Sequence, residues 1–406
     1  MPIEEGGLYR NILISVDNSE HSRSAEAIGV LLGKSLKAKI TGIHVYSGMF
    51  HQIRFKILEE HLPDKYQKDE VLAYQQKIHS VLIERGLELI SLEYMKNLKD
   101  ACHDASLPFE EKLVDGKNSD MIIEQAASHD LVVMGALGIG AVPGVSKLGS
   151  NTRRVLHSTE KDVLIVKKKS DLKTIVVGID GSNYSIQTVE CAARLANTLG
   201  ANLHILSCYD PDLHRVIFKS LADVLSEEAG KVFKFKEQEQ LHNQVIDATL
   251  ENLYHRHLEN ARGIAKQLNI SASTELLKGK PYCALCEKAE SLDADLLVVG
   301  RYGMHRGKKD SIGSNAERLV EISSTNVLVT SATAVNHLSA ISSQSQVENK
   351  PQKKLVWTED ARKHLENIPS FARPLAVLVI ERYAREQGII TITPDVMRKV
   401  QEIKKK

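Results

Sequence analysis

The chain contains 406 residues, more than one ordinary hydrophobic core needs, and this length predicts two or three domains of about 100 to 200 residues. Its 53 lysine and arginine residues nearly balance its 52 aspartate and glutamate residues, so the composition gives no indication of a nucleic-acid partner. An apolar content of 42% is normal for a folded soluble protein.

The N-terminus and the cysteines indicate the cell compartment. The first ten residues lack the charged and then apolar pattern of a signal peptide, and no apolar run approaches the ~18 residues that span a bilayer. Five cysteines, an odd number scattered through a long chain, argue against a disulfide framework and fit a reducing compartment. We therefore expect a cytoplasmic protein that does not enter a membrane.

Several segments occur twice in the same order, which indicates a duplicated domain. Residues 11–31 match residues 174–194, with Asp17 opposite Asp180. Three more pairs follow: 38–46 with 201–209, 130–140 with 295–305, and 162–167 with 326–331. Residues 1–170 are called the first copy below, and residues 171–331 the second copy.

Each copy alternates short β-branched runs with longer segments of helical period, which is typical of buried parallel strands with crossover helices. We predict an α/β fold with two tandem doubly wound, parallel five-stranded sheets. Ligands of such sheets bind outside the carboxyl ends of the strands where the strand order reverses, so the residues after strands one, two and four should meet. These residues are Asp17, Val45 and Gly135 in the first copy and Asp180, Cys208 and Gly300 in the second.

Long insertions follow the second strand of each copy, at residues 49–105 and 211–268, and both are charged and helical in pattern. Amphipathic helices packed on the sheet are the favoured interpretation, and a lid or docking surface is the alternative. The last strands, 162–167 and 326–331, would be exposed sheet edges unless they pair. We therefore expect an intrachain pseudo-dimer through these strands, with a further homodimer left open.

A separate module ends the chain. Residues 332–353 are rich in serine, glutamine and asparagine and are predicted to be a linker. Residues 354–406 have the pattern of three helices. Thr358 and Ser370 are candidate caps of the first two, and Thr393 followed by Pro394 is expected to begin the third.

The loop after the fourth strand of the second copy carries the clearest chemical signal. Its glycines, Gly300, Gly303 and Gly313, let backbone N–H groups approach a phosphate closely, and the helix that follows favours an anion at its N-terminus. The loop is also basic, with Arg301, Arg306, Lys308 and Lys309. These are the elements of a triphosphate cradle without a Walker sequence.

The G-x2-G-x9-G-S pattern after a buried strand, with an aspartate ending the first strand, resembles the universal stress protein family over residues 9–169 and 172–330. The resemblance implies an adenine-nucleotide α-hydrolase-like fold that binds ATP, with or without Mg²⁺. In the second copy it implies that Asp180 and Cys208 hold adenine and ribose, and that the phosphates contact Gly300, Gly303, Gly313, Ser314 and Asn315. The equivalents in the first copy are Asp17, Val45, Gly135, Gly138, Gly149 and Ser150.

The first copy departs from this pattern. Ten residues separate Gly138 from Gly149 where the pattern has nine, and the loop contains Pro143 and one cation, Lys147. We therefore expect the main nucleotide site in the second copy. The alternative for either copy is a degenerate fold that keeps its glycines for turn geometry alone.

Residues 355–402 are similar to the small domain that ends one subunit of light-independent protochlorophyllide reductase. The similarity rests on Trp357, Pro369, Arg373, Glu381 and Pro394. The module contains no cysteine, so no iron–sulfur chemistry is carried over from that reductase. Arg373 and Glu381 belong either to a site for an anionic tetrapyrrole or, in the favoured interpretation, to an ion pair.

Three further motifs invite interpretation as a redox, metal or catalytic site, but in each case a simpler interpretation is favoured. Cys283 and Cys286 form C-x2-C, but no second such pair exists and core packing is favoured over a redox or zinc site. His255 and His257 point in different directions on a helix and are expected on the surface. Ser314 has no histidine or carboxylate partner within its motif, so binding is favoured over nucleophilic attack.

The function we predict is that of a universal stress protein, an adenine-nucleotide-binding regulator or protectant without dedicated catalysis, which hydrolyses ATP slowly at most. The C-terminal helices are expected to dock a protein partner that the sequence does not name. One alternative is an accessory subunit of a reductase or tetrapyrrole-related enzyme system. The other is a scaffold that binds no nucleotide.

Overall fold

The computed structural model describes residues 8–58, 61–63, 65, 69–142, 144, 146–210, 247–304, 311–331, 356–366, 377, 380–381, 383–384, 387 and 389–403. The chain divides into two compact units, Met1–Asn336 and His337–Lys406. The first unit contains both copies, and the second contains the C-terminal module. In the described part of the chain, no helix combines the length and the apolar character that crossing a bilayer requires.

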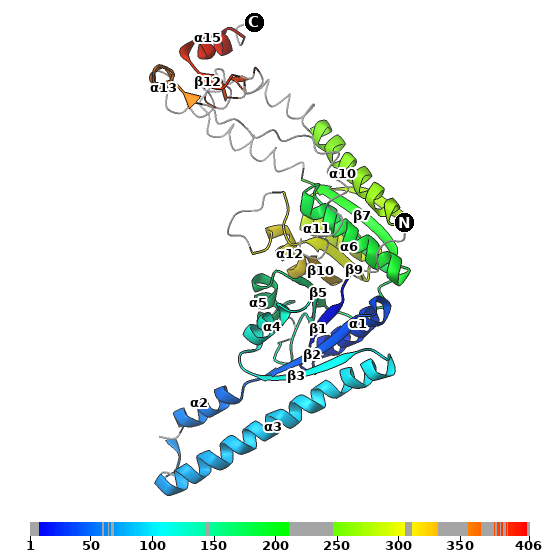
Figure 1. Ribbon diagram of the computed structural model, residues 1–406, viewed down its shortest axis with the longest axis vertical. Helices are drawn as coiled ribbons and strands as arrows, with labels where there is room; N and C mark the ends of the chain where they lie inside the picture. Colours follow the sequence, from blue (N-terminus) through cyan, green and yellow to red (C-terminus); the bar gives the residue numbers. More distant parts are fainter. Residues whose placement is uncertain are drawn as a thin grey trace. The chain divides into compact units, whose positions relative to one another are not determined.

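The first unit is built on one ten-stranded sheet (Figure 1), in which each copy supplies a parallel half, as predicted. The strands of the first copy are β1 (Asn11–Ser15), β2 (Lys39–Tyr46), β3 (Phe109–Asp115), β4 (Leu131–Gly135) and β5 (Asp162–Val166). Those of the second are β6 (Thr174–Ile179), β7 (Asn202–Tyr209), β8 (Ala272–Lys278), β9 (Leu296–Gly300) and β10 (Asn326–Thr330). The order is β3-β2-β1-β4-β5-β10-β9-β6-β7-β8, so the order reverses between β1 and β4 and again between β6 and β9.

Helices cover both faces of the sheet. One face carries α1 (Glu20–Leu36), α3 (Asp69–Asp104), α6 (Asn183–Leu199) and α10 (Asp247–Gln267), and the other carries α4 (Asn118–Ala126), α5 (Ser150–Ser158), α11 (Pro281–Ser291) and α12 (Ser314–Ile322). Successive strand residues enter opposite cores, since Ile12 and Ile14 pack on the first face and Leu13 on the second. The continuous apolar runs in the sequence therefore reflect burial on both faces.

The two copies join through their last strands, as predicted. β5 and β10 pair antiparallel, with Leu164 opposite Leu328. Two buried side chains close this junction reciprocally. The carboxylate of Asp162 accepts the backbone N–H of Ser331 at 2.6 Å, and the amide oxygen of Asn326 accepts that of Lys167 at 2.8 Å. The backbone N–H groups that directly follow β5 and β10 are thereby hydrogen-bonded across the junction.

The insertion of the first copy forms α2 (Gly48–Leu58) and α3, which extend together past the edge of the sheet in Figure 1. Near its end, α3 buries Met95 and Leu98 against the sheet, as the packing interpretation expects. Nearer its start, Leu82 is 65% exposed, so that interpretation holds for only part of the helix. In the second copy α10 packs on the sheet, and residues 211–246 lie outside the described residues.

The second unit has its own small core, formed by Ala361, Ile380, Ala384, Ile392, Val396 and Met397. Its helices include α13 (Glu359–Glu366) and α15 (Pro394–Ile403). The Thr358 hydroxyl accepts the N–H of Ala361 at 3.3 Å, and α15 begins at Pro394, so both of these start signals are confirmed. The helical pattern missed a parallel pair of two-residue strands, β11 (Val356–Trp357) and β12 (Thr391–Ile392). The predicted cap Ser370 lies outside the described residues.

Candidate functional site

Each copy has a cavity where its strand order reverses, of about 290 Å³ in the first copy and about 560 Å³ in the second. Every site residue expected from the sequence borders the cavity of its own copy. In the second copy these are Asp180, Cys208, Gly300, Gly303, Gly313, Ser314 and Asn315. In the first copy they are Asp17, Val45, Gly135, Gly138, Gly149 and Ser150. The fold brings together residues from three strands and one helix because parallel strands end at the same sheet edge.

The aspartate after the first strand fixes the glycine loop in both copies. Asp180 accepts the backbone N–H of Met304 at 2.7 Å, and Asp17 accepts that of Ile139 at 3.1 Å. The loop approaches so closely that a Cβ at Gly303 would lie 2.6 Å from the Asp180 carboxylate. Any larger residue at this position would have to displace the Asp180 carboxylate, so glycine allows the loop and the aspartate to meet.

The helix that follows each loop presents free backbone donors to its cavity. Gly313 is the N-cap of α12 and Gly149 that of α5, and neither helix has a side-chain cap hydrogen bond. Ser314 and Asn315 are exposed at the start of α12. The first N–H groups of such a helix carry about half a positive charge together and suit a phosphate.

The placement of Arg301 corrects the sequence-based interpretation of the basic loop. Its guanidinium donates to the carbonyl oxygens of Leu156 and Lys161 in the first copy, the latter at 3.1 Å, and to that of Ser311 in its own loop at 3.4 Å. The side chain is 1% exposed, and this burial lowers the pKa of the guanidinium. Arg301 therefore joins the two copies and does not face a phosphate.

The cation of the first-copy loop, Lys147, likewise contacts the other copy. The ammonium group of Lys147 donates to the carbonyl oxygen of Ile322, 2.8 Å away in the second copy. This residue closes the C-terminal end of α12, where a positive charge is favourable. Arg306, Lys308 and Lys309 lie outside the described residues. Among the described loop residues, backbone N–H groups are thus the main candidates for phosphate contacts.

Cys208 forms part of the wall opposite this loop. Its thiol donates to the carbonyl oxygen of Gly279 at 3.2 Å, and burial raises its pKa to about 12. The group is therefore a neutral packing surface at physiological pH and not a nucleophile. Burial likewise raises the pKa of Cys286 to about 11, and its side chain belongs to the core beneath α12. In the described part of the chain, no group of histidine, cysteine and carboxylate side chains is arranged to hold a metal ion.

Sequence reasoning missed two aromatic residues of α10. Tyr254 borders the second cavity and stacks on Tyr209, with ring centroids 5.8 Å apart. His257, expected on the surface, is half-buried against Gly181, where a Cβ would lie 2.2 Å from its ring. The expectation for His257 was wrong because this residue shares a helical face with Leu258 and Ala261, which are buried. That spacing is the signal that could have found it.

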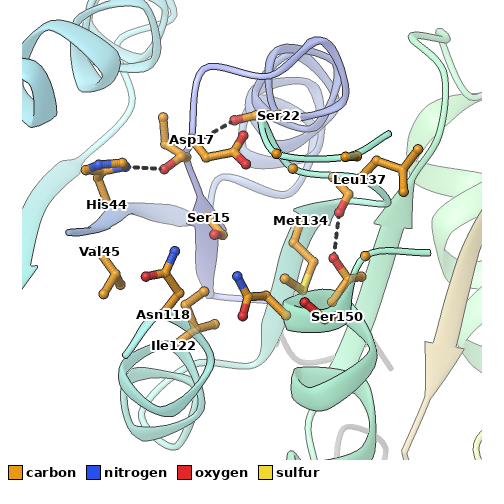
Figure 2. Close-up of a pocket in the computed structure, with 18 residues that line it drawn as sticks. Ser15, Asp17, Ser22, His44, Val45, Asn118, Ile122, Met134, Leu137 and Ser150 are labelled. Carbon is orange, nitrogen blue, oxygen red and sulfur yellow. Dashed lines mark hydrogen bonds between the residues drawn. The ribbon is translucent and has the colours of Figure 1, made fainter. Parts of the chain in front are cut away.

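The first cavity has a different lining (Figure 2). His44 points into it from β2 and is held by a 2.6 Å hydrogen bond between its Nδ1 and the carbonyl oxygen of Val16. Asn118 and Ile122 reach it from α4. The ring of His44 also meets Tyr94 edge to face at 5.2 Å. An ordered imidazole therefore occupies a position where the second copy has the smaller Ser207.

Comparison with known proteins agrees with the geometry. Residues 8–167 and 171–331 each match the universal stress protein family. The chain belongs to this family. Residues 357–400 match a second family, described as the proto-chlorophyllide reductase 57 kD subunit.

Individual universal stress proteins resemble one copy or both. A universal stress protein of Mycobacterium tuberculosis is 32% identical over 135 residues, which make up 33% of this chain and 80% of the relative. The crystal structure of one from Archaeoglobus fulgidus covers 80% of this chain and 97% of its own, with 17% identity and a TM-score of 0.50, and so shares the fold. A universal stress protein solved in complex with cAMP covers 40% of this chain and 98% of its own, with 25% identity and a TM-score of 0.27.

Proposed function

We propose that the chain binds ATP in the cavity of the second copy and acts as a nucleotide-dependent regulator in the stress response. The observation that carries this proposal is the uncapped N-terminus of α12, which faces a glycine loop clamped by Asp180. Such a cradle suits the phosphates of a nucleotide because it supplies backbone donors without a side chain that would fill the space. A cavity of about 560 Å³ also lies within the range of ligand pockets.

The arrangement supports binding more than turnover. Asp180 already accepts two backbone N–H groups, from Ser182 and Met304. The other carboxylate among the described lining residues, Glu317, lies 3.1 Å from the ring of His157. Neither is placed as a free base beside the glycine loop, and ATP hydrolysis needs a positioned water and charge stabilisation as well. We therefore infer slow hydrolysis at most, with Mg²⁺ entering with the nucleotide.

The test is to purify the protein natively, denature it and identify any released nucleotide by chromatography. Gly313→Asp is the matched variant, since a Cβ at Gly313 would lie 3.4 Å from the Arg301 carbonyl oxygen and the backbone φ of −71° suits any residue. The new carboxylate would cap α12 and repel a phosphate. Gly149→Asp makes the same change in the first copy.

We expect near-stoichiometric ATP from the wild type and from Gly149→Asp, and none from Gly313→Asp. Loss of nucleotide only from Gly149→Asp would move the site to the first copy. No nucleotide in the wild type, with no binding of added ATP by calorimetry, would contradict the proposal and favour a scaffold.

A second candidate function concerns the C-terminal module. Its match to a protochlorophyllide reductase family favours an accessory role beside a reductase or tetrapyrrole-related enzyme. The indole N–H of Trp357 donates to Glu381 at 3.1 Å, which links β11 to the helical residues of the module. Ile392→Asp would place a charge in the fully buried core of the module. The role would be supported if reductase subunits co-purify with the wild-type chain and are lost from Ile392→Asp. It would be contradicted if no reductase subunits co-purify with the wild-type chain.

A further inference from the structure

The two copies can be compared position by position through their buried helix residues. Met95, Leu98 and Cys102 of α3 are fully buried. The residues 163 positions later, Leu258, Ala261 and Ala265 of α10, are buried as well. The ends of the two insertion helices therefore lie on their half-sheets in the same register. Differences between the copies at equivalent positions then reflect side chains and not a shift of the helix.

One such difference lies beside the cavities. In the second copy, Tyr254 of α10 borders the cavity. Its equivalent in the first copy is Ser91, which is fully buried and donates to the carbonyl oxygen of Leu87 at 2.6 Å. The reverse holds on the second strand, where Ser207 donates to the carbonyl oxygen of Ile179 while His44 extends into the first cavity. The aromatic ring at this end thus comes from the helix in one copy and from the strand in the other.

Tyr254 is held in place by other aromatic side chains of its own copy. Its ring stacks on Tyr209 at an interplanar angle of 30° and meets His257 at 5.5 Å. Burial raises the pKa of its phenol, and the nearby charge of Asp180 raises it further, so the group is neutral at physiological pH. An aromatic ring fixed by neighbours loses little side-chain freedom when a ligand packs against it.

The position of Tyr254 in the cavity indicates which part of the ligand it would contact. Cys208 lies near the end of β7, which β6 separates from β9, the strand that leads to the glycine loop and to the N-terminus of α12 that suits phosphates. A ring beside Cys208 lies at the end of the cavity that is left for the base. Aromatic side chains bind bases by stacking, which contributes about 1 to 3 kcal/mol per base.

We propose that Tyr254 contacts the base and makes the cavity of the second copy selective for purine nucleotides over base-free polyphosphates. This inference rests on the proposed nucleotide function and deepens it. The chain would then recognise the base with a residue of the insertion helix and the phosphates with the glycine loop. The first copy has no tyrosine at the equivalent position, so its cavity lacks this contact.

The test compares ATP, UTP and inorganic triphosphate by titration calorimetry on the full chain. Tyr254→Ser places the residue of the first copy at this position, and Tyr254→Phe keeps the ring. Tyr254→Leu removes the ring but keeps apolar bulk against Tyr209, in case the serine variant does not fold. His255→Ala changes an exposed residue of the same helix and serves as the control.

For the wild type, Tyr254→Phe and His255→Ala, we expect ATP to bind more tightly than UTP or triphosphate. In Tyr254→Ser and Tyr254→Leu, ATP should weaken about tenfold, equivalent to about 1.4 kcal/mol, while triphosphate binding stays unchanged. Equal weakening of ATP and triphosphate, or no change in either, would overturn the inference while leaving the proposed function intact. A wild type that binds no ATP would overturn both.

Discussion

Replacing Arg301 by methionine would separate a role in joining the two copies from a role in holding phosphate. The guanidinium donates to two carbonyl oxygens of the first copy from a side chain that is 1% exposed. Hydrogen bonds from a charged donor contribute about 1.5 to 3 kcal/mol each, so two amount to about 3 to 6 kcal/mol. Methionine also removes the cost of burying a charge, which offsets part of the loss. We expect the free energy of unfolding to fall by about 2 to 4 kcal/mol.

Urea denaturation followed by circular dichroism measures this change, and titration calorimetry gives the ATP affinity of the same variant. Arg318→Met is the matched control, because Arg318 is exposed on α12 and its removal should leave the denaturation midpoint unchanged. For Arg301→Met we expect lower stability and an ATP affinity close to that of the wild type. An unchanged midpoint together with a large loss of ATP affinity would refute the structural role and restore the phosphate role.

Two further predictions follow from close contacts and from burial. Gly303→Ala should weaken ATP binding at least tenfold in a calorimetric titration, because the added Cβ would displace the Asp180 carboxylate. In contrast, Gly263 is at an exposed helix position with open space around it, so Gly263→Ala should stabilise the fold by about 0.5 to 1 kcal/mol. Equal affinities for the wild type and Gly303→Ala would count against the clamp. Burial raises the pKa of Glu26 from 4.5 to about 7, so its contribution to stability is complete below pH 4.5 and about 3 kcal/mol is lost as the pH rises through 7. Unfolding free energies at pH 4.5 and 8 should therefore differ less in Glu26→Gln than in the wild type or in the exposed control Glu20→Gln, and the same difference in all three would contradict the assignment.

The repeated strand runs and glycine loops carried most of the fold prediction. Runs without polar alternation predicted parallel strands buried on both faces, and the ten-stranded sheet has this form within each half. The antiparallel junction of β5 and β10 also followed from the sequence, since each strand would otherwise leave an unpaired edge. The site residues could be placed at one edge of the sheet because topology determines where parallel strands end.

Other features depended on contacts between segments far apart in the chain. The small strands β11 and β12 are two residues long each, which is too short for any periodic pattern to appear. The exposed part of α3 has the same apolar character as the part that packs on the sheet, so hydrophobicity alone did not separate them. Tyr254 borders the second cavity, with His257 beside it, only because α10 packs on β7.

The sequence by itself determined the duplication, the class of fold, the family and the set of loop residues that surround each cavity. These follow from local patterns, because strand, turn and helix-start preferences are set by neighbouring residues. Only the tertiary structure decided what the long side chains do. Arg301 belongs to a phosphate-like loop in the sequence, yet it reaches carbonyl oxygens of the other copy, more than a hundred residues away. A flexible charged side chain binds the best acceptors within its reach, and folding determines which acceptors those are.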